Sequence, residues 1–141
     1  MRTYEPLDAR VRELEPAYQS EAEARIGRML DRSGIPFLYR QPRLIYDDGY
    51  HDIWHPTFTL PQYDSLVLEY ADPATGLDYA GRRLAYHANG IPAIVAEGEE
   101  LSDPCWKEDL LQRIHGEYLR AQAEYRHQQI HGYYRDDAGS P

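Results

Sequence analysis

Residues 54–71 read WHPTFTLPQYDSLVLEYA, and this stretch decides which fold class the sequence predicts. Two runs rich in aromatic, β-branched and other apolar residues, Tyr50–Leu60 and Ser65–Ala71, favour β-strands. The residues between them, Pro61–Asp64, favour a turn. The second run is short and apolar except for Glu69, as is typical of a buried central strand. We therefore expect two neighbouring strands, with the Glu69 side chain either satisfied by partners or exposed at a cleft.

The sequence before this stretch predicts a helix followed by another strand. Ser20 and Glu23 form a capping-box pattern, in which the serine side chain accepts from the Glu23 N–H and the glutamate reaches back to the Ser20 N–H. Apolar residues at helical spacing follow, and Gly34 is placed to end the helix. Residues Ile35–Tyr46 then read as one extended run, closed by a turn at Asp47–Gly49.

The sequence after this stretch predicts a helix, a strand and a long last helix. The first helix is expected over Leu77–Asn89, with Leu84 on its apolar stripe, and the strand over Ile91–Ala96. The last helix is expected to start near Ser102. Its predicted buried stripe consists of Trp106, Leu110, Ile114, Tyr118, Ala121 and Tyr125.

These elements predict one α/β domain with a mixed sheet. Its expected range is residues 20–132, with the order helix, three strands, helix, strand, helix. We expect an N-terminal helical arm over residues 1–19 and a frayed tail over residues 133–141.

The composition excludes several classes of protein. The chain has 141 residues, 15 basic against 24 acidic, and a formal net charge of −9, which argues against a general nucleic-acid coat. Its single cysteine excludes an internal disulfide framework and an all-cysteine zinc site. No apolar run approaches the roughly 18 residues that span a bilayer, and the start lacks the apolar stretch of a signal peptide. We expect a cytoplasmic protein with no membrane contact.

The basic residues are unevenly distributed along the chain. Residues 20–46 hold five arginines against three acids, whereas Lys107, far along the chain, is the only lysine. A face that meets a polyanion therefore draws on this segment, with Arg82 and Arg83 as further candidates. The candidate nucleic-acid-binding residues are Arg25, Arg28, Arg40 and Arg43. The alternative is that these arginines form an ordinary solvated surface.

Two local patterns sharpen the fold prediction. One is the Pro56-Thr57-Phe58 segment followed by a strand that ends in Glu69-Tyr70-Ala71, and the other is a helix with paired arginines leading into Gly90-Ile91-Pro92. Together with Ser20 and Glu23, they make residues 18–125 resemble the PD-(D/E)XK nuclease superfamily. The resemblance implies the restriction-endonuclease-like fold, with an αβββαβ core, here followed by a long C-terminal helix.

The same resemblance implies which residues carry the chemistry. In that family two carboxylates bind Mg²⁺ and a lysine stabilises the transition state. Here Thr57 occupies the position of the aspartate and Ala71 that of the lysine, so that Glu69 and Glu23 alone match acidic positions.

Other residues of the chain are candidates for the roles of the missing aspartate and lysine. His55 would share a strand face with Thr57 and offer a nitrogen ligand, which gives Glu69 and His55 as candidate metal ligands. Arg82 or Arg83 would replace the lysine from the following helix. The candidate catalytic set is then Glu69, Glu23, His55, Arg82 and Arg83, with Mg²⁺ as the cofactor if the domain is active and none otherwise.

The thirteen tyrosines suggest a surface for a partner. Trp54, Tyr46, Tyr50 and Tyr63 cluster around the second strand run, where they would serve protein contact, base stacking or core packing.

The leading functional prediction is a degenerate, non-catalytic nuclease-like domain that binds a protein partner or, weakly, DNA. One alternative is an active metal-dependent DNA endonuclease with migrated catalytic residues. A second is a structural subunit of a phage or mobile-element assembly. The sequence gives no oligomeric state.

Overall fold

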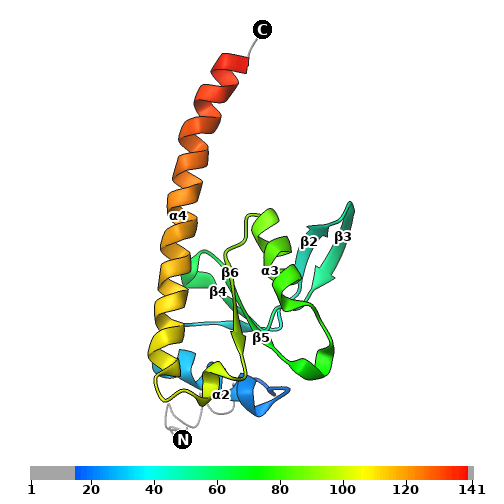
Figure 1. The fold of residues 1–141 in the computed structure, drawn as a ribbon, viewed down its shortest axis with the longest axis vertical. Helices are drawn as coiled ribbons and strands as arrows, with labels where there is room; N and C mark the ends of the chain where they lie inside the picture. The colour runs from blue at the N-terminus through cyan, green and yellow to red at the C-terminus, as the bar shows by residue number, and fades with distance from the viewer. Residues whose placement is uncertain (1–14, 140–141) are drawn as a thin grey trace, which may run out of the picture.

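The computed structural model describes residues 15–139. The predicted helical arm over residues 1–19 lies mostly outside this range, and its described part, residues 15–19, is not helical. Figure 1 shows a sheet covered by helices, a separate hairpin at one side, and a last helix that extends well past the sheet. The expectation of a mixed α/β fold with a mixed sheet and a long C-terminal helix is confirmed.

The main sheet has four strands. They are β1 (Leu38–Tyr39), β4 (Phe58–Leu60), β5 (Leu66–Ala71) and β6 (Ala93–Glu97), and they lie in that order across the sheet. Strand β4 pairs antiparallel with β1 and with β5, whereas β6 pairs parallel with β5. Parallel pairing requires a crossover, which helix α3 (Tyr79–Ala88) provides. Strand β5 therefore has a neighbour on both edges, as its apolar sequence predicts.

Two of the predicted strand runs are each divided in the structure. The run Ile35–Tyr46 was expected to be continuous, but it separates into β1 and β2 (Arg43–Asp47), because Arg40 adopts a left-handed backbone with φ of 51° and Pro42 has no N–H to donate. The run Tyr50–Leu60 separates at Pro56 into β3 (Tyr50–Trp54) and β4.

Strands β2 and β3 form their own two-stranded antiparallel sheet. The predicted turn joins them, with Asp48 at φ of 50° and Gly49 at φ of 85°, the two positive values that a tight hairpin turn needs. The hairpin lies beside α3 (Tyr79–Ala88) in Figure 1. Its attachment is specific: the Asn89 side chain accepts from the Tyr46 N–H and donates to the Tyr46 carbonyl.

Helices α2 (Glu21–Arg32) and α4 (Trp106–Gly139) pack on one face of the main sheet. Alternation along β5 turns Leu66 and Leu68 toward them. The buried core on this face comprises Ile26, Met29, Leu30, Ile35, Phe58, Leu60, Leu66, Leu68, Ile94, Ala96, Leu101, Trp106, Leu110 and Ile114. Gly34 follows the end of α2 with φ of 70°, as predicted.

Helix α3 and the hairpin pack on the other face of the sheet. Ile45, Val67, Tyr86 and Ala93 form a smaller buried cluster there. Leu84 was expected on the buried stripe of α3, but it is 70% exposed. The helix instead turns Tyr86 inward, because the aromatic ring fills the space between hairpin and sheet.

Short 3₁₀ turns connect the main elements: η1 (Pro61–Tyr63), η2 (Pro73–Thr75) and η3 (Glu100–Ser102). The turn expected at Pro61–Asp64 is confirmed by η1.

Helix α4 is only partly covered by the rest of the domain. Trp106, Leu110 and Ile114 are buried as predicted, whereas Tyr125 is 59% exposed, since α4 there has passed the edge of the sheet. The backbone is helical rather than frayed over residues 133–139, and no proline interrupts the sequence between residues 106 and 139. No helix in the described part of the chain has the length and apolar character that crossing a membrane requires.

Candidate functional site

Glu69 is the one acidic residue of β5, and the sheet encloses it. Side chains alternate along the strand, so that Leu68 faces α2 and α4 while Glu69 faces α3. Strand β6 covers its other edge, where Glu69 pairs in register with Val95. Glu69 is only 2% exposed, and a carboxylate buried to this extent needs partners for both oxygens.

The Glu69 carboxylate has such partners on both oxygens. The Thr57 N–H donates to Oε1 over 2.7 Å, and the Thr57 hydroxyl lies 3.4 Å from the same oxygen. Arg82 Nε donates to Oε2 over 3.0 Å. The Thr57 hydroxyl oxygen also accepts from the Tyr70 N–H. Thr57 thus fastens the start of β4 to β5 through polar contacts.

Arg82 is held in place by three groups. Besides Glu69, its guanidinium carbon lies 4.2 Å from the centre of the Trp54 ring, and Nη2 is 3.4 Å from the Tyr86 hydroxyl. Burial, and then the negative charge of Glu69, raise the pKa of Tyr86. The Tyr86 phenol therefore stays neutral at physiological pH, and the ion pair contains one negative and one positive charge.

Glu23 forms a second ion pair, on the other side of Thr57. Arg40 Nη2 lies 2.9 Å from Glu23 Oε1, and the Tyr39 hydroxyl donates to the same oxygen over 3.1 Å. Burial lowers the pKa of Arg40, but the hydrogen bonds with Tyr39 and Glu23 outweigh it and raise that pKa overall. Glu23 is 1% exposed, so its charge too is compensated within the chain.

The predicted capping box is present with one difference. The Ser20 side chain accepts from the Glu23 N–H over 3.1 Å, as expected. The difference is that the Glu23 carboxylate accepts from the Ser20 hydroxyl and from Arg40 rather than from the Ser20 N–H, and it points into the domain. Glu23 therefore joins the helix cap to the site.

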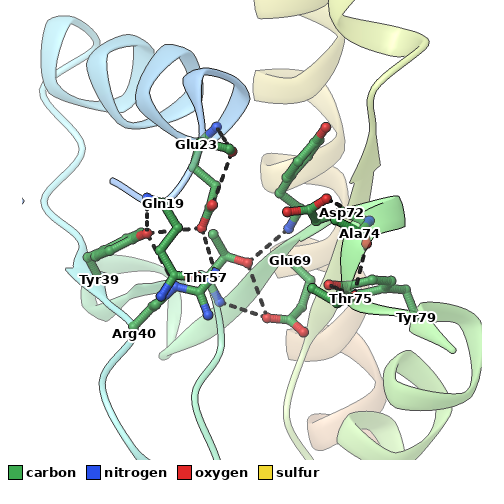
Figure 2. A network of polar contacts seen from close by, with 12 residues as sticks. Gln19, Glu23, Tyr39, Arg40, Thr57, Glu69, Asp72, Ala74, Thr75 and Tyr79 are labelled. Atoms are coloured by element: carbon green, nitrogen blue, oxygen red, sulfur yellow. Dashed lines mark hydrogen bonds and ion pairs between the residues drawn. The ribbon is translucent and has the colours of Figure 1, made fainter. Parts of the chain in front are cut away.

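The structure brings Glu23, Thr57 and Glu69 together. Figure 2 shows Thr57 between the two acidic residues, with Arg40 beside it. The backbone completes this arrangement, because the Arg40 N–H donates to the Thr57 carbonyl over 3.1 Å.

Two predicted site residues have other contacts. His55 is exposed, its Nδ1 lies 3.2 Å from the Arg40 carbonyl oxygen, and among the described residues it makes no hydrogen bond or ion pair with Glu69, the other ligand of the predicted metal site. Arg83 is also exposed and donates to the Ala93 carbonyl over 3.3 Å. Ala71, at the end of β5, contributes no polar side chain to the site.

The residues around Glu69 do not fit a magnesium ion. Mg²⁺ needs near-octahedral oxygen ligands at about 2.1 Å and several water molecules. Here Thr57 and Arg82 hold both Glu69 oxygens, and the Arg82 guanidinium would repel a divalent cation. The described part of the chain contains no group of three or more His, Cys, Asp or Glu side chains that could hold a metal.

The candidate nucleic-acid-binding arginines all have hydrogen-bond or ion-pair partners within the same chain. Arg40 pairs with Glu23, and Arg43 donates to the Ser65 carbonyl over 2.6 Å, where burial lowers its pKa. Arg25 donates to the Leu101 carbonyl over 2.9 Å. Arg28 pairs with Glu15 and Glu21 at the surface. These four arginines therefore do not form one free basic face.

Sequence reasoning missed the roles of Trp54 and Tyr39. Both were visible as aromatic residues next to a suspected site, but nothing in the sequence tells which aromatic ring covers which arginine. The pairing of Arg40 with Glu23 was also missed. It depends on a left-handed backbone at Arg40, and the usual sequence signal for that conformation, a glycine, is absent there.

No protein-family model matches the chain, and comparison with the curated proteins and with the solved structures gave no match either.

Proposed function

We propose that the chain is a non-catalytic domain with the restriction-endonuclease-like fold that works by binding a protein partner. The element order supports the fold: α2, β1, β4, β5, α3 and β6 follow the αβββαβ order when the β2–β3 hairpin is taken as an insertion. The sequence resemblance supports it as well, because Glu23, Thr57 and Glu69 meet at one site.

The observation that carries the loss of catalysis is the closed ion pair of Glu69 and Arg82. A nuclease of this type needs a carboxylate pair that is free to take a metal ion and a cation that is free to meet the phosphate. Here the carboxylate and the cation neutralise each other at 3.0 Å, and Trp54 covers the guanidinium.

A plasmid-nicking assay tests this proposal. We expect no nicking by the wild-type chain with Mg²⁺ or Mn²⁺, and no difference from a Glu69→Ala variant. Metal-dependent nicking that disappears in Glu69→Ala would overturn the non-catalytic assignment and favour the migrated active site.

The hairpin supplies the surface that supports protein binding. The β2–β3 register pairs Leu44 with Ile53 and Tyr46 with His51, so these four side chains lie on one face of the hairpin. The opposite face carries Ile45, which is buried against α3 and the sheet. Leu44 is 65% exposed, Tyr46 53% and Ile53 60%. We call Leu44, Tyr46, His51 and Ile53 the outer hairpin face.

The charge around the outer hairpin face indicates the kind of partner. Asp48 is exposed at the turn, and Asp47 and Asp52 are exposed on the face that also carries Ile45, whereas the basic residue of the hairpin, Arg43, is turned inward to the Ser65 carbonyl. An apolar face on a hairpin whose exposed charges are carboxylates complements a peptide segment with apolar residues and flanking basic residues. We therefore propose a basic, amphipathic protein segment as the partner.

Selection from a displayed random-peptide library tests the partner. We expect enriched peptides that combine apolar and basic residues and that bind the Leu44→Ser/Ile53→Ser variant at least roughly tenfold more weakly than wild type. Leu84→Ser is the matched control, because Leu84 is equally exposed but lies on the side of α3 opposite Tyr86. No enrichment, or equal binding to Leu44→Ser/Ile53→Ser, would contradict the proposal.

A further inference from the structure

A second basic feature lies away from the site just described. A pocket of about 460 Å³ opens between helix α2, turn η3 and the start of α4. Arg25, Arg28 and Arg32 line it from α2, and Lys107, the only lysine of the chain, lines it from α4. Its volume falls in the range of about 300–1,000 Å³ that is usual for small-molecule sites.

Helix geometry separates this pocket from the Glu23 site. Residues 25, 28 and 32 are spaced by three and four positions, so their side chains follow one face of α2 over about 10 Å. At about 100° per residue, Glu23 lies roughly 140–200° around the helix from them. The two sites are therefore independent, and the inference below does not rest on the proposed function.

The pocket carries an excess of positive charge in an acidic protein. Four cationic side chains line it against one carboxylate, that of Asp103, while the whole chain has a net charge of −9. Within the part of the chain that the structure describes, Arg32 and Lys107 make no ion pair. Arg28 contacts Glu15 and Glu21 at 3.3 and 3.6 Å, but its side chain is 49% exposed, and such surface pairs exchange readily for another anion.

Part of the pocket is already ordered for binding. Arg25 donates to the Leu101 carbonyl over 2.9 Å, and its guanidinium carbon lies 5.1 Å from the centre of the Trp106 ring. Lys107 Nζ lies 5.8 Å from the centre of the same ring. Trp106 is only 7% exposed, so this ring is a fixed support beneath two cations. Less side-chain entropy is then lost when an anion binds.

We propose that this pocket binds a small polyanion with two or more phosphate or carboxylate groups. Arginine recognises both groups through paired hydrogen bonds, and three arginines along 10 Å of helix match two or three such groups in a row. A compact ligand is favoured over an extended nucleic acid, because Glu15, Glu21 and Asp103 lie next to the pocket and would repel a longer anionic chain.

Isothermal titration calorimetry on the full chain at low ionic strength tests the proposal. The probes are inorganic pyrophosphate and tripolyphosphate for phosphate and citrate for carboxylate, each as the sodium salt. We expect saturable binding with one site, weakened by added salt, and a change in tryptophan fluorescence as the cations over Trp106 are engaged. Whichever of the two groups of probes binds more tightly identifies the chemical group.

Two variants decide whether the pocket is the site. Arg32→Gln/Lys107→Gln removes two cations that make no ion pair in the described chain, so the fold is retained, and we expect binding to weaken at least roughly tenfold. Arg126→Gln is the control, since it removes an exposed arginine about 30 Å along α4 from Lys107. Circular dichroism of each variant checks the fold.

Four outcomes would overturn the proposal. These are no saturable binding by any probe, equal binding by the wild type and the Arg32→Gln/Lys107→Gln variant, an equal loss in Arg126→Gln, and a short DNA duplex that displaces the probe with higher affinity. The third outcome would mean general electrostatic attraction, and the fourth would mean a nucleic-acid surface.

Discussion

Replacing Arg82 by methionine tests whether the Glu69 charge is compensated within the chain. Methionine keeps an unbranched stem against Trp54 but removes the cation, and the Glu69 carboxylate then remains 2% exposed with only Thr57 as donor. At 3.0 Å and an effective dielectric constant of 20, the lost attraction is about 5.5 kcal/mol. Breaking a buried pair generally costs about 3–5 kcal/mol.

The expected loss for Arg82→Met lies at the lower end of this range. The Arg82 side chain is 16% exposed, so water reaches part of it, and the Thr57 hydrogen bonds remain in the variant. We expect the free energy of unfolding to fall by about 3 kcal/mol near pH 7.

A second substitution separates charge from packing. In Glu69→Gln/Arg82→Met, the glutamine carbonyl still accepts from the Thr57 N–H, and no buried charge remains. We expect this double variant to be more stable than Arg82→Met alone by at least about 1 kcal/mol.

Urea unfolding followed by far-UV circular dichroism measures both changes, with equal slopes as the check on two-state behaviour. The reasoning would be refuted if Arg82→Met lowered the free energy of unfolding by less than about 1 kcal/mol. It would also be refuted if the double variant lost as much as Glu69→Gln and Arg82→Met lose together as single variants.

Three further predictions concern parts of the fold that hold the site and the hairpin. Gly27→Ala should lower the free energy of unfolding by about 1–3 kcal/mol in urea titration, because a Cβ at residue 27 would overlap the Tyr18 ring and hydroxyl. Asn89→Ala should cost about 1–2 kcal/mol and speed hydrogen exchange in β2, because both bonds to the Tyr46 backbone are lost. Burial, and then the charge of Glu15, raise the pKa of Tyr18 to about 12, above its unfolded value of 10.0. The contribution of protonated Tyr18 to stability is thus complete below about pH 10 and is lost as the pH rises toward 12. In Tyr18→Phe, the free energy of unfolding should fall less over this pH range than in the wild type, which unfolding measured across that range would show.

The sequence predicted the elements whose signals are local. The Ser20 cap, Gly34, the Asp47–Gly49 turn and the apolar run of β5 each act within a few residues, and each is found where expected. The division of the run Ile35–Tyr46 depends on Arg40, whose positive φ has no sequence signature because the residue is not glycine.

The error at Leu84 has a different origin. The spacing of residues on α3 is compatible with more than one buried face. The apolar residues at helical spacing favoured the face that includes Leu84. The structure uses the face of Arg82 and Tyr86, because these two side chains meet Glu69 and Trp54 across the domain. Such a choice depends on contacts between residues far apart in the sequence, which periodicity cannot register.

The same distinction applies to the candidate site. Glu69 and Glu23 were found because a lone acid in an apolar strand and a capping glutamate are unusual in sequence. Arg82 was one of two equal candidates, and the structure separates it from Arg83, which turns to the Ala93 carbonyl.

The residue types at the site form one consistent electrostatic arrangement. A metal-binding carboxylate pair carries two negative charges that repel each other until a divalent cation neutralises them. With threonine at position 57, that second charge is absent, and a single guanidinium is enough to neutralise Glu69. The uncharged Thr57 also donates to the carboxylate, as an ionised aspartate side chain would not. Thr57 and Arg82 therefore depend on each other: the threonine makes one cation sufficient, and the arginine supplies it from inside the chain. This dependence is the physical basis of the proposal that the site serves the architecture of the domain rather than metal-dependent cleavage.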